Sequence, residues 1–378
     1  MSNIIIIGPA HPLRGGGMVT FNQRLAKEFI DKGHSCTIVS FSLQYPSFLF
    51  PGTSQTTTEA APTFVSIRSL INSINPINWI KVGYLLKKEK HDLIVVRFWI
   101  PFMGPALGTI LRILKKNKHS KIICIADNII PHEKRVGDSI FTRYFLNSCD
   151  AFITMSENVL NDLHQFIVSK PAVFEPHPPY DNFENPISKK DAREFLNLSS
   201  TNKIILFFGF IRAYKGLDIL LHSMADERIK KSSIQLLVAG EFYESEAKYK
   251  QLVSQLDITE NVLFHTNFIP DAEVHYYLCA ADVVMQPYRA ATQSGVTPLA
   301  YHFEKPIIVT NVGSLAAYVP HEKVGLVTNP DSTSIADAIL KFYELGENYF
   351  IPQLRTEKEK YSWNNMVTAI LKLAKLTS

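Results

Sequence analysis

Cysteine is scarce in this sequence, and the few cysteines present are not spaced for metal binding. The 378 residues include four cysteines, with no Cys-x-x-Cys pair among them: Cys36, Cys124, Cys149 and Cys279. Such wide spacing indicates neither a zinc site nor a disulfide framework. We therefore expect the four thiols to be small residues of a hydrophobic core.

Long apolar runs are also lacking. No stretch reaches the roughly 18 to 20 uncharged apolar residues that a helix needs to cross a bilayer. The apolar segment at residues 1–8 has no basic leader before it, so no signal peptide is predicted. These two absences predict a cytoplasmic protein.

The composition that is present is globular, and the charge is uneven. Hydrophobic residues make up 46% of the chain and charged residues 20%, and the length predicts two domains. Residues 1–175 contain 19 Lys and Arg against 12 Asp and Glu, a net charge of +7, whereas the whole chain carries +4. The charge therefore concentrates in the first half.

Six of these cations form two clusters, each closing a predicted helix: Lys87, Lys88, Lys90, Lys115, Lys116 and Lys118. Each cluster has two interpretations. One is a solvated helix end, where cations are favoured by the helix dipole. The other is a basic face that rests on anionic lipid. No aromatic residues interleave the lysines as in a nucleic-acid site, so no nucleic-acid partner is predicted.

Apolar runs rich in β-branched residues alternate with helical periodicity, which indicates βαβ units around parallel sheets. The predicted buried strands are residues 3–7, 35–41, 92–98, 121–126 and 151–154 in the first half, and residues 203–209, 234–239, 262–264, 282–286 and 306–310 in the second. Each half is thus predicted to be a doubly wound α/β domain, whose ligands bind beyond the carboxyl ends of the strands. An active site is expected between the two domains.

Three prolines mark the boundary between the halves. Pro176, Pro178 and Pro179 make a poor helix or strand, so residues 176–186 are predicted to be a linker. The predicted domains are residues 1–175 and 187–361. Residues 362–378 contain a final helix with apolar residues at helical spacing.

A glycine-rich loop follows the first predicted strand. Gly15, Gly16 and Gly17 precede a helix, where backbone amides can face an anion; the alternative is a turn that binds nothing. The loop is not Gly-x-Gly-x-x-Gly, and the second strand ends in Val39-Ser40-Phe41 with no acidic residue for a ribose. A dehydrogenase is therefore not predicted.

The strongest local signal lies after residue 209. A strand ends at Gly209, and Arg212 and Lys215 follow in a short loop before a helix that begins near Gly216. Two cations at the carboxyl end of a strand suit a diphosphate, because a guanidinium and an ammonium neutralise the charge that grows on a leaving group. The alternative interpretation is a surface loop with solvated cations.

A second strand-to-helix junction follows residue 286. Small polar residues and a glycine connect the two elements, with Pro298 tolerated in the first turn of the helix. The amides at the helix start, together with the hydroxyls of Thr292 and Ser294, predict a second anion site. A capped helix without a ligand is the alternative.

Together these motifs resemble those of the retaining glycosyltransferases of family 4, which have the GT-B fold of two Rossmann-like doubly wound domains. The carriers are the glycines at 15–17, the Gly-x-x-Arg-x-x-Lys-Gly run at 209–216, the Ser-Gly-Val turn at 294–296, and the Lys-Pro strand at 305–313. The resemblance covers essentially the whole chain. It implies that the last helix packs back on the first domain, and that the second domain binds a nucleotide sugar.

The resemblance also implies roles for individual residues. Arg212 and Lys215 bind the donor diphosphate and support catalysis together with His132, which the family places near the reacting sugar. The donor-binding residues it implies are Gly16, Gly209, Glu241, Phe268, Ile269, Thr292, Ser294, Gly295 and Val296. In the first domain the acceptor-side residues are His11, Arg14, Arg97 and Asp127. Arg97 is expected either to meet an anionic acceptor or to form a buried ion pair, and Asp127 to orient its loop.

One departure from the family pattern concerns two glutamates. The family carries them before the Lys-Pro strand, whereas residues 286–303 contain none, and Leu299 stands where the second is expected. No Asp-x-Asp occurs in the chain, so no metal ion is predicted and the two cations are expected to replace it.

The sequence thus predicts a metal-independent glycosyltransferase with a UDP- or GDP-linked sugar as co-substrate and no other cofactor. A glycan or lipid-linked acceptor is expected, in surface polysaccharide or glycolipid synthesis, with peripheral contact to the inner face of the membrane through the basic domain. Residues 44–62 are expected on the acceptor side. The alternatives are a non-catalytic nucleotide-sugar-binding subunit and a nucleotide-sugar 2-epimerase of the same fold.

Overall fold

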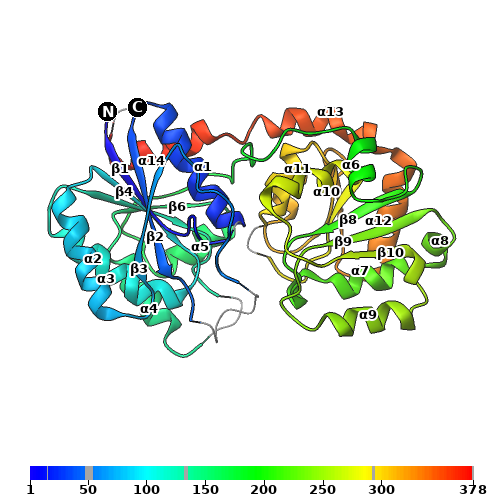
Figure 1. Cartoon of the computed structure of the whole chain (residues 1–378), viewed down its shortest axis with the longest axis horizontal. Helices are drawn as coiled ribbons and strands as arrows, with labels where there is room; N and C mark the ends of the chain where they lie inside the picture. The colour runs from blue at the N-terminus through cyan, green and yellow to red at the C-terminus, as the bar shows by residue number, and fades with distance from the viewer. Residues whose placement is uncertain (15, 47–53, 132–134, 292–293, 377–378) are drawn as a thin grey trace. The chain divides into compact units, whose positions relative to one another are not determined.

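The computed structural model describes residues 1–14, 16–46, 54–131, 135–291 and 294–376. The chain divides into two compact units (Figure 1). Unit 1 contains Met1–Pro178 and Ser362–Ser378, and unit 2 contains Pro179–Tyr361. Each unit is built around its own parallel sheet.

Unit 1 has a seven-stranded sheet in the order β3-β2-β1-β4-β5-β6-β7. Its strands are β1 (Asn3–Ile7), β2 (Ser35–Leu43), β3 (Ser66–Asn72), β4 (Leu93–Phe98), β5 (Lys121–Ala126), β6 (Ala151–Thr154) and β7 (Ala172–Phe174). Its helices are α1 (Gly17–Asp31), α2 (Pro76–Glu89), α3 (Gly104–Lys115), α4 (Asp138–Leu146), α5 (Glu157–His164) and α14 (Trp363–Ala374).

Helices cover both faces of this sheet. Side chains on a strand alternate between the faces, and on β4 Arg97 lies against Phe21 of α1 while Phe98 stacks on Phe145 of α4. Therefore α1 lies on one face and α4 on the other. α3 packs between α2 and α4, and α14 contacts α1, β5 and β6. The final helix thus belongs to unit 1.

Unit 2 has a six-stranded sheet in the order β10-β9-β8-β11-β12-β13. Its strands are β8 (Lys203–Phe208), β9 (Ile234–Ala239), β10 (Val262–His265), β11 (Val283–Gln286), β12 (Ile307–Thr310) and β13 (Gly325–Thr328). Its helices are α6 (Lys189–Phe195), α7 (Leu217–Met224), α8 (Glu227–Lys230), α9 (Glu246–Gln255), α10 (Val274–Ala280), α11 (Val296–His302), α12 (Ser332–Leu345) and α13 (Glu347–Lys358).

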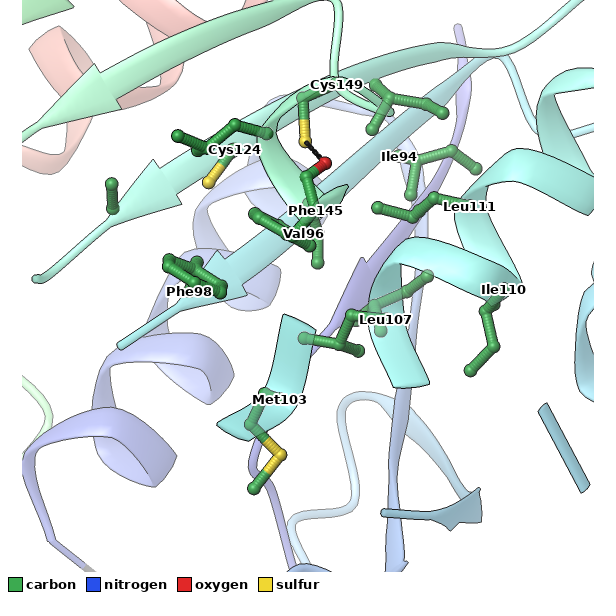
Figure 2. Packing of buried hydrophobic residues seen from close by; sticks show 14 of the residues in the cluster. Ile94, Val96, Phe98, Met103, Leu107, Ile110, Leu111, Cys124, Phe145 and Cys149 are labelled. Atoms are coloured by element: carbon green, nitrogen blue, oxygen red, sulfur yellow. Dashed lines mark hydrogen bonds between the residues drawn. The ribbon is translucent and has the colours of Figure 1, made fainter. Parts of the chain in front are cut away.

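Figure 2 shows the packing of the unit 1 core between the sheet and α3. Phe98 and Phe145 stack with their ring centroids 4.3 Å apart, and Cys124 and Cys149 lie among these apolar side chains. All four cysteines of the chain are buried free thiols. Their predicted role as core residues is confirmed.

The ten predicted strands are all present, with bounds that differ by at most two residues. Three observed strands were not predicted: β3, β7 and β13. Each of them lies at an edge of its sheet. Residues 175–188 contain no helix or strand, and the chain passes from unit 1 to unit 2 between Pro178 and Pro179. Among the residues described above, no helix is long and apolar enough to span a membrane.

Candidate functional site

The candidate site in unit 2 lies at the carboxyl ends of the central strands, where parallel α/β sheets bind ligands. The loop after β8 runs between the loops that follow β9 and β11, its neighbours in the sheet. Gly209 donates its backbone hydrogen bond to Ala239 (2.9 Å), and Arg289 donates its own to Tyr214 (2.7 Å). Both neighbouring loops therefore fix the path of residues 209–216.

Gly209 opens this loop with a φ of +91°, which an L side chain rarely adopts. A Cβ placed there would lie 3.3 Å from Nζ of Lys215 and 3.8 Å from a methyl carbon of Val296. Three of the predicted donor-site residues are thus brought together by the fold. The absence of a side chain at 209 leaves the backbone open beside the Lys215 ammonium.

Lys215 is the most unusual charge in this region. Its side chain is buried, with 9% of the residue exposed, and Nζ lies 5.7 Å from the centre of the Tyr288 ring. No residue that the structure describes forms a hydrogen bond or ion pair with its ammonium group. Burial, and then the nearby charge of Arg212, lower the pKa of Lys215 to about 7. The site therefore has a largely buried amine whose charged form a bound anion would stabilise.

Arg212 differs from Lys215 in being exposed. Its guanidinium carbon lies 4.9 Å from the centre of the Tyr243 ring, a cation–π distance. Tyr243 in turn packs on Phe210 and donates its backbone N–H to Ile211 (3.0 Å). Arg212 is therefore held by an aromatic face, and its fork of N–H donors stays available to a ligand.

An ion pair that the sequence did not predict fixes the loop that carries Lys215. Arg289 forms two hydrogen bonds with the Asp218 carboxylate, at 2.7 and 2.6 Å, and a third with the Ala213 carbonyl at 3.0 Å. Residues 213–215 form a short 3-10 helix directly before α7. The pair joins the start of α7 to the loop after β11, so it fixes the loop that carries Lys215, whose Nζ lies 5.7 Å from the centre of the Tyr288 ring.

The turn before α11 has the local structure that the sequence predicts. The Ser294 hydroxyl accepts a hydrogen bond from the Val296 amide (3.2 Å) and lies 3.3 Å from the Tyr288 hydroxyl. Gly295 is exposed, whereas Leu299 is only 4% exposed. A leucine therefore lies buried where the family pattern has a carboxylate. Thr292 lies outside the described residues.

The residues assigned to the nucleoside side follow β9 and β10. Glu241 is 9% exposed and comes after Gly240, which donates a backbone hydrogen bond to His265 at the end of β10 (2.9 Å). Phe268 and Ile269 are half-buried and lie beyond that strand. They belong to the same carboxyl edge as Gly209, because β10, β9 and β8 are consecutive in the sheet.

In unit 1, Arg97 and Asp127 contact each other. Their two hydrogen bonds measure 2.5 and 2.6 Å, and Arg97 also lies over the Phe21 ring at 4.0 Å. Of the two interpretations of Arg97, the structure contains the buried ion pair. Its Nη1 atom has no partner among the described residues.

The other two predicted acceptor-side residues, His11 and Arg14, lie in the loop that follows β1, at the carboxyl edge of the unit 1 sheet. The His11 ring lies 3.0 Å from the Glu59 carbonyl, and the Arg14 amide donates to Gln55 (2.8 Å). Gly16 caps α1 with a φ of +144°. His132 lies outside the described residues, as do residues 47–53 of the predicted acceptor segment. Among the residues that are described, no group of three His, Cys, Asp or Glu could hold a metal ion.

Two family models match the chain and together cover both units. "Glycosyltransferase Family 4" matches residues 15–176, and "Glycosyl transferases group 1" matches residues 188–360. An uncharacterized glycosyltransferase of Methanocaldococcus jannaschii is 24% identical over 310 residues, 78% of each chain. The lipopolysaccharide core biosynthesis mannosyltransferase LpsB of Rhizobium meliloti is 29% identical over 173 residues, which are 43% of this chain and 47% of LpsB.

Solved structures share the fold over the whole chain. Anabaena HepE, solved in complex with UDP-glucose, superposes with a TM-score of 0.72 at 15% identity, covering 99% of each chain. The two parallel sheets with alternating helices are the architecture common to these proteins. The expected fold and resemblance are thereby confirmed: this chain belongs to the family 4 glycosyltransferases and is a glycosyltransferase of the GT-B fold.

Proposed function

We propose that the protein transfers a sugar from a nucleotide-diphosphate sugar to an acceptor hydroxyl, with retention of the anomeric configuration and without a metal ion. The observation that carries this proposal is the buried Lys215 ammonium, which lacks an anionic partner among the described residues. A buried charge without a counter-ion is costly. A diphosphate bound against Gly209 would supply the missing anion.

The remaining donor contacts follow from the same position. Arg212 would bind the diphosphate from the exposed side, and the amides of residues 294–296 would bind its distal phosphate. The two cations stabilise the charge that develops on the leaving group, so no metal ion is needed. A phosphate oxygen can itself accept the proton of the attacking hydroxyl. His132 is proposed as the contact to the reacting sugar.

The donor and the setting are proposed from relatives and from charge. UDP-sugars are the first donors to test, because HepE was solved with UDP-glucose, and GDP-sugars are the second. The likeness to LpsB supports a role in lipopolysaccharide or other surface glycan synthesis with a glycan or lipid-linked acceptor. The positive charge of residues 1–175 supports a cytoplasmic protein at the inner face of a membrane. Acceptor contacts are proposed for His11 and Arg14.

Transfer is tested by incubating the protein with a nucleotide sugar, a chelator and a membrane lipid extract, and following the anomeric protons by NMR. We expect the donor to be consumed only when the acceptor is present, and the product to keep the donor's anomeric configuration. Conversion of the donor alone into an isomeric nucleotide sugar would indicate a 2-epimerase instead.

Leu299 favours a second candidate function. The buried Leu299 side chain cannot provide the ribose contact that a carboxylate gives in the family. A non-catalytic nucleotide-sugar-binding subunit would bind the donor through Lys215 and never transfer the sugar. Donor binding without turnover in every acceptor mixture would favour this function.

A further inference from the structure

The outer face of α2 exposes an unusual number of apolar side chains. Ile77 is 66% exposed, Ile80 46%, Tyr84 50% and Leu85 41%. The positions 77, 80 and 84 follow the i, i+3, i+7 spacing of one helix face. The opposite face is buried in the unit at Val82 and Leu86, so the helix is apolar on two sides.

This exposed face belongs to a well-fixed helix. The Asn75 side chain caps the first turn through the Asn78 amide (3.1 Å), and the Asn78 side chain donates to the Leu70 carbonyl (3.0 Å). The Trp79 ring N–H donates to the Asn72 carbonyl at the end of β3 (2.7 Å). The exposed residues therefore have a defined position, and those of the first turns lie near the carboxyl edge of the sheet.

Lysines share the exposed face. Lys81 and Lys88 are exposed there, and 100° per residue places both within the arc of the apolar side chains. The acid of the helix, Glu89, is engaged by Arg68 (2.9 Å) and by the His91 ring (2.8 Å). The α2 outer face, defined as Ile77, Ile80, Lys81, Tyr84, Leu85 and Lys88, is therefore apolar and positive.

A second exposed apolar group lies in the same helical layer. α2, α3 and α4 pack in that order along one side of the unit 1 sheet (Figure 1). Ile140 is 71% exposed and Phe141 41% exposed, both in the first turn of α4. Gly104 lets α3 approach the Phe141 backbone, because a Cβ there would lie 2.4 Å from its carbonyl oxygen.

We propose that the α2 outer face docks on an anionic lipid bilayer, with the apolar side chains entering the headgroup region and Lys81 and Lys88 contacting lipid phosphates. Charge decides between a lipid surface and a protein partner: lysine is depleted from the centres of protein interfaces. Lysines around an apolar helix face are typical of helices that lie on anionic membranes. The surface deepens the proposed membrane setting, and would bring lipid-linked acceptors to the ligand-binding edge of unit 1.

The test is co-sedimentation of the full chain with vesicles of phosphatidylcholine, alone or mixed with phosphatidylglycerol. We expect binding to the mixed vesicles only, weakened by salt. The double changes Ile77→Glu/Ile80→Glu and Lys81→Glu/Lys88→Glu should each lower the apparent affinity at least roughly tenfold. As matched controls, Val168→Glu replaces an apolar residue that is 84% exposed elsewhere, and Lys190→Glu an exposed lysine of unit 2. Both should bind like wild type.

Two results would overturn this proposal: wild type that ignores phosphatidylglycerol vesicles, or α2 variants that bind as well as the controls. The first result would leave a protein partner as the occupant of the face. Melting temperatures verify that each variant is folded. Thermal stabilisation by nucleotide sugar, measured on the same samples, reports the proposed function separately, because the α2 outer face contains no residue of the donor site.

Discussion

Lys215 should make donor binding depend on pH. Its pKa is lowered to about 7 by burial, and then by the nearby charge of Arg212. A bound diphosphate favours the charged form, so it raises this pKa. Below pH 7 the ammonium is already charged and affinity is flat. Above pH 7 binding must take up a proton, and affinity should fall by up to roughly tenfold per pH unit.

Isothermal titration of a nucleotide sugar in two buffers of different ionisation enthalpy measures this proton uptake directly. The diphosphate of a nucleotide sugar keeps its charge over the range, so the protein group is the one that titrates. Equal affinity at about pH 6.5 and pH 8.5, with no proton uptake, would mean that the diphosphate does not contact Lys215.

Lys215 should lower the free energy of unfolding of the ligand-free protein. Lys215→Met removes an unpaired buried cation while keeping a long side chain, so the ligand-free protein should become more stable by about 1 kcal/mol. Lys189→Met is the matched control, because Lys189 has carboxylate partners in Asp282 (2.7 Å) and Glu347 (2.5 Å). The control should lose about 1 kcal/mol. Denaturant unfolding measures both changes, and a destabilised Lys215→Met protein would contradict the account.

At the scale of elements, the Arg289–Asp218 pair should position the Lys215 loop. Asp218→Asn removes the charge from a pair that joins α7 to the loop after β11, and donor affinity should fall about tenfold. The pH at which donor affinity begins to fall should also change, because the pKa of Lys215 depends on how deeply its loop buries it. Asp226→Asn is the control: it breaks the surface pair with Arg228, which lies at α8. If both variants lose a little stability and bind the donor as wild type does, the Arg289–Asp218 pair has a purely structural role.

The elements that the sequence did not predict share a physical reason. β3, β7 and β13 are edge strands, with one neighbour each and partly exposed residues. β3 has serine and arginine among its apolar residues, and β7 and β13 are only three and four residues long, so none of the three shows the long apolar run by which buried parallel strands are recognised. In α2 the buried face could not be predicted, because the helix is apolar on two sides. Nothing in the sequence distinguishes Val82, which is buried, from Ile80, which is 46% exposed.

For the whole molecule, the two parallel sheets were predictable because their central strands are almost entirely apolar, and the family because its motifs stand at strand ends. Arg212 and Lys215 could be named as candidate site residues from their spacing alone. The burial of Lys215 could not, because it depends on neighbours such as Tyr288, which the loop after β11 contributes. Nor could the Arg289–Asp218 pair, whose members lie 71 residues apart in the chain.

The central claim, a donor diphosphate site at Lys215 and Arg212, is tested most directly by thermal stabilisation with UDP, GDP, ADP and TDP sugars in the presence of a chelator. Wild type and Arg212→Ala are compared, with Arg228→Ala as a control for an exposed arginine elsewhere in unit 2. The account predicts a shift with sugars of one nucleotide that persists in Arg228→Ala and disappears in Arg212→Ala. No shift with any nucleotide sugar in the folded protein, or a shift that Arg212→Ala leaves intact, would contradict it.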